Sequence, residues 1–191
     1  MVDTGKAGID YQGAIAGLSL GELEELVQGL GHKAFRAKQI YHWIYQRQAT
    51  GMEEMTNLPR ALREQLSDFR FWPWKIVIRR GSVDGTVKLL LEAIDGSQVE
   101  TVAIPEGNRT TVCVSTQVGC AMGCTFCATG QLGFARNLTS QEILGQVLLA
   151  RAATGRQITN VVYMGMGEPL LNYDAVLGSI ALLNDPQGLA I

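Results

Sequence analysis

The sequence lacks the features that mark membrane and secreted proteins. Hydrophobic residues make up 47% of the 191 residues, yet no stretch comes near the roughly 18 consecutive apolar residues that a membrane-spanning helix needs. The first residues do not show the basic and then apolar pattern of a secretory signal. The sequence therefore predicts no membrane-spanning segment, and we expect a location in the cytoplasm.

The chain also has little net charge, which is −2 at pH 7. A near-neutral chain is a poor candidate for nucleic-acid binding, because contacts to phosphate depend on Lys and Arg. The charge is unevenly distributed, however. Residues 32–80 carry ten basic and four acidic side chains and therefore +6, which leaves −8 for the remainder of the chain.

The same segment, 32–80, contains eight of the thirteen aromatic residues (five Phe, three Trp and five Tyr in the whole chain). Basic residues interleaved with aromatics are typical of surfaces that follow a phosphate backbone and stack unpaired bases. The composition also fits a small domain whose aromatics form its own core and whose charges form a solvated helix face. Composition alone leaves both alternatives open.

Cysteine is scarce, with four residues in the chain, but three of them are clustered in Gly119-Cys120-Ala121-Met122-Gly123-Cys124-Thr125-Phe126-Cys127. This C-x3-C-x2-C spacing lets one tight loop turn three thiols toward a single metal centre. Thiolates are soft ligands suited to iron-sulfur clusters or zinc. In a 4Fe-4S cluster, three cysteines would leave one iron without a protein ligand and open to another molecule.

Histidine is scarcer still, and this weakens the zinc alternative. A closed tetrahedral zinc site needs a fourth ligand, usually from a second C-x2-C or an H-x3-5-H pair. The chain has no Cys after Cys127, and His32 and His42 lie far upstream. Cys113 could still complete a zinc site. A disulfide is less favoured, because clustered thiols in an intracellular protein are more often metal-binding or catalytic.

Helical patterns occupy the first third of the chain. We expect a flexible tail over residues 1–17, which are rich in Gly and have no periodicity. Ser19 and Glu22 form a capping box at the start of a helix, a second helix places Ile40 and Ile44 on one face, and a third begins near Pro59. These helices predict a compact accessory domain over residues 18–73.

Strand patterns follow from residue 74. Residues 76–78, 87–94 and 99–104 are predicted strands, separated by the turn dipeptides Asp84-Gly85 and Asp95-Gly96. They predict a short antiparallel meander.

The rest of the chain alternates between strands and helices. A strand over 111–118 leads into the cysteine loop, and a capping box at 139–142 begins a helix that ends at Gly155. A buried strand over 158–164 then leads to Gly165-Met166-Gly167-Glu168-Pro169 and a further helix. This order predicts parallel strands with the active site at their carboxyl ends.

Two strand-helix units cannot cover a parallel sheet on both sides. The last residues, Gly188-Leu189-Ala190-Ile191, are apolar and have the pattern of a third strand that is beginning. We therefore expect the chain to be truncated at its C-terminus.

The cysteine motif, with Phe126 before the last Cys, and the surrounding run from Thr110 to Leu138 resemble the RlmN/Cfr family of radical S-adenosylmethionine (SAM) RNA methyltransferases. The resemblance implies a radical SAM core over residues 74–191, forming the first units of an incomplete (β/α)6 partial TIM barrel. It also implies a 4Fe-4S cluster whose open iron binds SAM. The cluster ligands would be Cys120, Cys124 and Cys127.

Other residues match the family's functional positions. Gly165–Pro169 resembles the SAM-binding turn, in which Gly167 and Glu168 would contact SAM. Cys113 matches the cysteine that resolves a methylated intermediate by attacking a second, methyl-carrying cysteine, which has no counterpart up to residue 191. Glu100 matches the proposed proton acceptor. Locally, Cys113 also fits a small core residue and Glu100 the polar face of a strand.

The resemblance implies methylation of adenosine C2 in 23S rRNA and tRNA through a methyl-cysteine intermediate, by a monomer that takes electrons from a donor such as flavodoxin or ferredoxin. C2 is favoured because the matching stretch is closer to RlmN. The alternatives are a Cfr-like enzyme that attacks adenine C8, a radical SAM enzyme with a substrate other than RNA, and a zinc-stabilised RNA-binding module without catalysis. We expect the 191-residue chain to be inactive alone.

Overall fold

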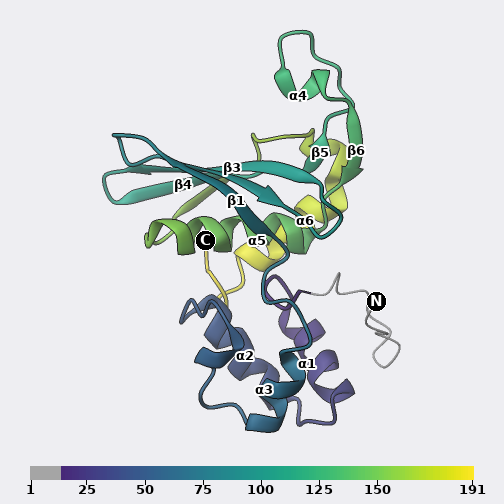
Figure 1. The fold of residues 1–191 in the computed structure, drawn as a ribbon, viewed down its shortest axis with the longest axis vertical. Helices are drawn as coiled ribbons and strands as arrows, with labels where there is room; N and C mark the ends of the chain where they lie inside the picture. Colours follow the sequence, from purple (N-terminus) through teal and green to yellow (C-terminus); the bar gives the residue numbers. More distant parts are fainter. Residues whose placement is uncertain (1–13) are drawn as a thin grey trace.

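The computed structural model describes residues 14–191. It has an N-terminal group of helices, a five-stranded sheet and a long helix between them (Figure 1). Most of the expected tail, residues 1–13, lies outside the described residues. The prediction was wrong for residues 14–17, because Ile15 is fully buried and its backbone N–H donates to the Arg70 carbonyl at 2.9 Å. The local sequence pattern of residues 14–17 does not indicate that they pair with a segment more than 50 residues away.

The N-terminal helices are α1 (Leu20–Gly29), α2 (Phe35–Tyr45), a 3-10 turn η1 (Met52–Glu54) and α3 (Arg60–Leu66). The predicted capping box at Ser19 and Glu22 is present, with the Ser19 N–H donating to the Glu22 carboxylate at 2.7 Å. The buried residues of the three α-helices recur at helical spacing, so these faces form the core of this part. Most of the aromatic residues of segment 32–80 contribute to this core, which is one of the two alternatives that the composition left open.

The sheet contains β1 (Lys75–Gly81), β2 (Val87–Glu92), β3 (Gln98–Glu106), β4 (Arg109–Cys113) and β7 (Asn160–Val162), in the order β1-β2-β3-β4-β7. The first four strands are antiparallel, which confirms the predicted meander. β4 and β7 are parallel, with Cys113 opposite Val162. The sheet thus changes from antiparallel to parallel at β4, as strand-helix-strand connections require.

The predicted strand over 111–118 is broken. β4 ends at Cys113, and residues 117–119 form β5 (Gln117–Gly119), which pairs antiparallel with β6 (Phe134–Asn137) in a separate hairpin. The Thr116 N–H donates to the Met166 carbonyl, which belongs to the turn after β7. The chain leaves the sheet at this point because its backbone finds other partners there.

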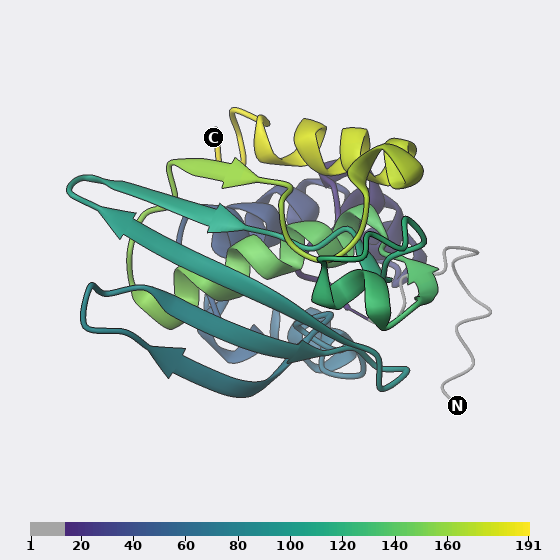
Figure 2. The same ribbon diagram turned by 90° about the horizontal axis from the view of Figure 1, so that it is seen from above.

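Helix α5 (Ser140–Thr154) lies between the sheet and the N-terminal helices (Figure 1). Residues 142–151 are all buried, so the helix is covered on every side. α6 (Tyr173–Leu183) follows the 3-10 turn η2 (Pro169–Asn172) and packs against α5. Over its central strands, the opposite face of the sheet carries no helix of the described chain (Figure 2).

Polar contacts join the N-terminal helices to the α/β part. Arg151 of α5 is buried and donates to the carbonyls of Tyr45 and Ile44, at 2.9 and 3.1 Å, at the end of α2. Burial lowers the pKa of Arg151 to about 10. The Trp74 indole donates to the Glu142 carbonyl at 2.7 Å. The Arg151 contacts hold the end of α2 against α5, and the Trp74 contact holds the start of the sheet segment against α5. The buried apolar residues of the two parts form one continuous core.

Within residues 14–191, no helix is both long enough and apolar enough to cross a membrane.

Candidate cofactor-binding site

The cysteine loop is closed at its base by the β5-β6 hairpin. Gly119 has a φ of 74°, and a Cβ there would collide with the carbonyl oxygen of Gly133 across the hairpin. The Cys120 N–H donates to that same carbonyl at 2.9 Å. Glycine is therefore required at position 119 both for its backbone conformation and for the close approach of the two strands.

All four cysteines are free thiols of intermediate exposure. Beyond the hairpin, the Cys127 N–H donates to the Cys124 carbonyl at 3.1 Å, and the short helix α4 (Ala128–Gln131) begins. Backbone hydrogen bonds from Gly130 and Thr129 lower the pKa of the Cys127 thiol, because they favour its thiolate. Thiolate is the form that ligates metals.

The donor set of this loop fits an iron-sulfur cluster by its chemistry. Three thiols occur in one loop that contains no histidine or carboxylate. The side chains are not gathered at ligand positions, since residues 14–191 contain no group of three or more His, Cys, Asp or Glu placed to hold a metal ion. Phe126 is 91% exposed, so its side chain is not part of the core.

The Gly-Glu-Pro turn lies beside this hairpin. The Gly165 N–H donates to the Val114 carbonyl at 3.0 Å, and a Cβ on Gly165 would lie 2.7 Å from that oxygen. Gly167 has a φ of 99°. Glu168 accepts from the Leu170 N–H at 3.1 Å and so begins η2. The structure thus brings the predicted SAM-binding turn and the cysteine hairpin together at the carboxyl ends of β4 and β7.

Glu100 and Cys113 lie on the sheet face away from α5. Cys113 is opposite Val102 in the β3-β4 register, and Glu100 is two residues before Val102, which places both side chains on the same face. Partial burial raises the pKa of the Cys113 thiol. The Glu100 carboxylate forms an ion pair with Lys88 at 2.6 Å, and both side chains are about half exposed.

Arg136 of β6 contacts the start of α5 and the turn between β2 and β3. It donates to the Glu142 carboxylate at 2.8 and 2.9 Å and to Asp95 at 2.7 Å. The Glu142 side chain is buried and also completes the capping box of Thr139. These hydrogen bonds raise the pKa of Arg136, and the Arg136 guanidinium lowers the pKa of Asp95 to about 2.

Arg136 falls within the run from Thr110 to Leu138 that resembles the family, but its neighbours in the sequence do not distinguish it from a surface residue. The structure shows that it anchors the cysteine hairpin to the start of α5 and to the β2-β3 turn. Its partners are 6 and 41 residues away. The capping-box glutamate, Glu142, was visible in the sequence, but its second role as an ion-pair partner was not.

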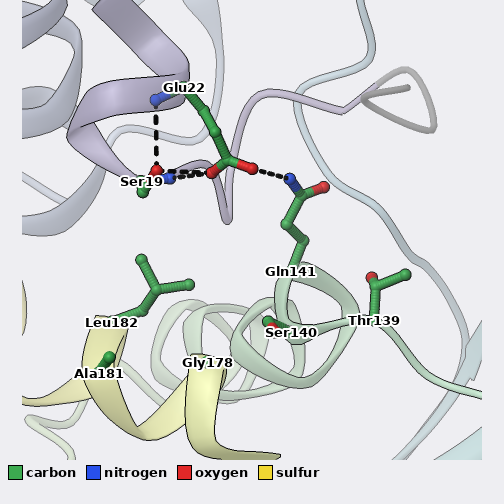
Figure 3. A pocket seen from close by; sticks show the side chains of 8 residues that line it. All are labelled: Ser19, Glu22, Thr139, Ser140, Gln141, Gly178, Ala181 and Leu182. Carbon is green, nitrogen blue, oxygen red and sulfur yellow. Dashed lines mark hydrogen bonds between the residues drawn. The ribbon is translucent and has the colours of Figure 1, made fainter. Parts of the chain in front are cut away.

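A cavity of about 490 Å³ lies between α1, α5 and α6 (Figure 3), and none of the predicted site residues lines it. The two capping boxes face it, and Gln141 donates to Glu22 across it at 3.2 Å. Its lining includes Leu182 and Ala181 of α6. The helix starts at this cavity are already capped by their own side chains, so we assign it to the interface between the two parts.

Comparison with known proteins agrees with both parts of the structure. A family model described as the ribosomal RNA large subunit methyltransferase N-terminal domain matches residues 14–70, and one described as the radical SAM superfamily matches residues 114–189. The chain is 50% identical over 184 residues to the dual-specificity RNA methyltransferase RlmN of Oleidesulfovibrio alaskensis. The chain belongs to the RlmN family of radical SAM proteins.

The same family assignment follows from a relative in Gloeobacter violaceus, a probable dual-specificity RNA methyltransferase RlmN, which is 47% identical over 175 residues. These matches cover 92% of this chain but 51% and 50% of the relatives. The crystal structure of a radical SAM methyltransferase from Sphaerobacter thermophilus has a TM-score of 0.86 at 45% identity, covering 92% of this chain and 53% of that chain. The chain spans about half the length of the curated relatives it matches.

The family and the fold class predicted from the sequence are therefore confirmed. The first family model covers the N-terminal helices, and the second covers the cysteine loop and the Gly-Glu-Pro turn. The β5-β6 hairpin carries the cysteine loop and lies beside the Gly-Glu-Pro turn. Its two strands were not predicted from the sequence.

The Arg136 contacts generate a stability prediction. Arg136→Met should lower the free energy of unfolding by about 3 kcal/mol at pH 7, because it leaves the buried Glu142 carboxylate without its ionic partner. Arg109→Met breaks an exposed ion pair with Glu106 and should cost less than about 1 kcal/mol. Urea unfolding of both variants measures the difference, and equal losses would contradict this account.

The partner Asp95 should give a pH signature in the same experiment. Its pKa is lowered in the folded state to about 2. The contribution of the Asp95 carboxylate to the free energy of unfolding is therefore complete above its pKa of about 4 in the unfolded chain, and it is lost as pH falls toward about 2. Asp95→Asn should therefore be less stable than wild type at pH 7, and the difference should shrink below pH 4. A difference that persists unchanged in acid would refute the assignment.

Proposed function

We propose that the protein is a radical SAM methyltransferase that methylates C2 of adenosine in 23S rRNA and tRNA through a methyl-cysteine intermediate. The observation that carries this proposal is the placement of the cysteine loop beside the Gly-Glu-Pro turn, at the carboxyl ends of two parallel strands, in a chain of the RlmN family. Ligand sites in such sheets form at this edge. The RNA substrates would place the protein in the cytoplasm.

Cys120, Cys124 and Cys127 would hold a 4Fe-4S cluster, and Gly167 and Glu168 would contact SAM. When bound, the cluster supplies the electron that starts radical chemistry on SAM, and a flavodoxin- or ferredoxin-type donor would reduce it again. Glu168 can accept hydrogen bonds from a ligand ammonium group, and Gly167 would contact SAM through its backbone.

Glu100 and Cys113 would act on the open face of the sheet. Their shared face gives both side chains access to one substrate, and Glu100 would accept the proton released from adenine. Cys113 would resolve the methylated intermediate by attack on the sulfur of a second cysteine. A disulfide would form, the bond from that sulfur to the carbon attached to adenine would break, and this carbon would take a proton to become the methyl group. The raised pKa of Cys113 keeps its thiol protonated at neutral pH, so this attack would require removal of the thiol proton in the assembled site.

RNA would contact the N-terminal helices through α2. The guanidinium of Arg36 lies 4.5 Å from the centre of the Phe35 ring, and that of Arg47 lies 4.9 Å from the centre of the Trp43 ring. Trp43 and Arg36 both donate to Asn57, at 2.6 and 3.4 Å. These residues form one surface of guanidinium and aromatic groups, the arrangement that pairs with phosphates and stacks bases. We refer to the five as the α2 surface.

The cluster assignment can be tested by metal analysis. The chain purified without oxygen should contain iron and sulfide, and Cys124→Ala should remove most of both, because two thiolates hold a cluster weakly. Cys113→Ala is the matched control and should keep the wild-type iron content, since Cys113 lies on β4 outside the loop. Zinc without iron would instead support the structural-zinc alternative.

The methylation assignment needs a protein of the relatives' length. We would join this chain to the remaining part of the Oleidesulfovibrio alaskensis relative and supply SAM, a reductant and tRNA or rRNA. The product should be 2-methyladenosine by mass spectrometry, and Cys113→Ala should abolish turnover. The 191-residue chain alone should be inactive, because it has no cysteine after Cys127 to carry the methyl group. Formation of 8-methyladenosine would assign C8 instead.

The RNA assignment predicts salt-dependent binding through the α2 surface. Arg47→Gln should weaken binding of a single-stranded RNA and reduce the slope of log K against log salt by about 0.7, the value for one lost phosphate contact. Arg109→Gln removes the same charge from the β3-β4 turn and should leave the slope unchanged. Equal effects of the two variants, or no RNA binding by wild type, would contradict the assignment.

A further inference from the structure

Gln117 connects the cysteine hairpin to the Gly-Glu-Pro turn. Its side chain is buried, with 1% of its surface exposed. Its Oε1 accepts from the Glu168 N–H at 2.9 Å, and its Nε2 donates to Asn137 Oδ1 at 2.8 Å. One side chain therefore bonds to the turn with one end and to the second strand of the hairpin with the other.

The turn also packs closely against the backbone and the Cβ of Gln117. A Cβ on Gly167 would lie 2.6 Å from the Gln117 Cβ and 2.7 Å from its backbone nitrogen. The Met166 carbonyl accepts from the N–H groups of Thr116 and Gln117, at 2.8 and 3.2 Å. The spacing between turn and hairpin is thus fixed by close contact as well as by hydrogen bonds.

Asn172 provides a second connection between the two segments, this time from a residue after the turn to the ends of the hairpin. It follows the turn, is 7% exposed, and donates through Nδ2 to the carbonyls of Thr116 and Leu138, both at 2.8 Å. Thr116 lies just before β5 and Leu138 just after β6, so Asn172 holds the two ends of the hairpin. The Leu138 N–H also donates to the Thr116 carbonyl at 3.0 Å.

We propose that Gln117 is a positioning residue that couples the cysteine loop to Glu168, so that order imposed on the loop is transmitted to the turn. The proposal rests on the proposed function, in which the loop holds the cluster and the turn contacts SAM. Each end of the buried Gln117 side chain has a hydrogen-bond partner. Such a bridge fixes the relative placement of two binding segments more narrowly than apolar packing does.

Amide hydrogen exchange of the 191-residue chain tests this coupling, with and without cluster reconstitution under anaerobic conditions. In wild type, reconstitution should slow exchange across 165–169 by roughly fivefold, an effect of the size of one hydrogen bond. Gln117→Leu has a similar volume but no polar atoms. It should keep the wild-type iron content and lose this protection.

Gln117→Glu should restore the protection, because a carboxylate accepts from the Glu168 N–H and from the Asn137 amide once that amide is turned over. Gln98→Leu, on the exposed surface of β3, is the matched control and should behave like wild type. Gln117→Leu removes the acceptor of the Glu168 N–H and should therefore speed exchange at the turn in both states. A purely structural role would speed exchange equally and leave the ratio between the two states at its wild-type value, whereas coupling predicts that this ratio falls toward one.

The outcomes separate this inference from the proposed function. Wild type without iron refutes both, whereas wild type with iron but without protection at 165–169 refutes only the coupling. Protection that persists in Gln117→Leu also overturns it. If Gln117→Leu unfolds or loses iron, Asn137→Ala removes only the hairpin end of the bridge and should abolish the protection, and its persistence there would likewise refute the coupling.

Discussion

The parallel pairing of β4 with β7 is the interaction on which the candidate site depends. It places Cys113 opposite Val162, and the hydrogen bonds continue past both strand ends, from Val114 to Val162 and from Gly165 to Val114. Two loops that are more than 30 residues apart in sequence are therefore side by side. This pairing brings the cysteine loop and the Gly-Glu-Pro turn to the same edge of the sheet, where the contacts of Gln117 and Asn172 fix their spacing.

Helix α5 makes this pairing possible, because a parallel pair needs a crossover that returns the chain to the same edge. Burial on every side ties α5 to the sheet, to α6 and to the N-terminal helices at once. Glu142 at its start holds Arg136 of the hairpin, and Arg151 near its end holds the carbonyls that end α2. The site and the N-terminal helices are thus positioned from opposite ends of one helix.

Local signals in the sequence predicted the elements that local chemistry determines. The capping boxes at Ser19 and Thr139 and the Asp-Gly turns were confirmed, because each involves residues within three or four positions of one another. The break in the strand after Cys113, the packing of residues 14–17 and the β5-β6 hairpin were missed. Each arises from backbone partners that are tens of residues distant, such as Met166 for Thr116 or Arg70 for Ile15.

The chemical motifs were predictable, whereas the contacts that hold them in place were not, and the difference has a physical cause. The cysteine spacing and the glycine positions can be read directly from a short run of residues. Gln117, Asn172 and Arg136 look like ordinary polar residues until the fold places them between two segments. Apolar packing tolerates substitution and small shifts, but a buried amide that bonds at both ends permits one spacing. The geometry of this site therefore depends on a few polar side chains rather than on the bulk of the core.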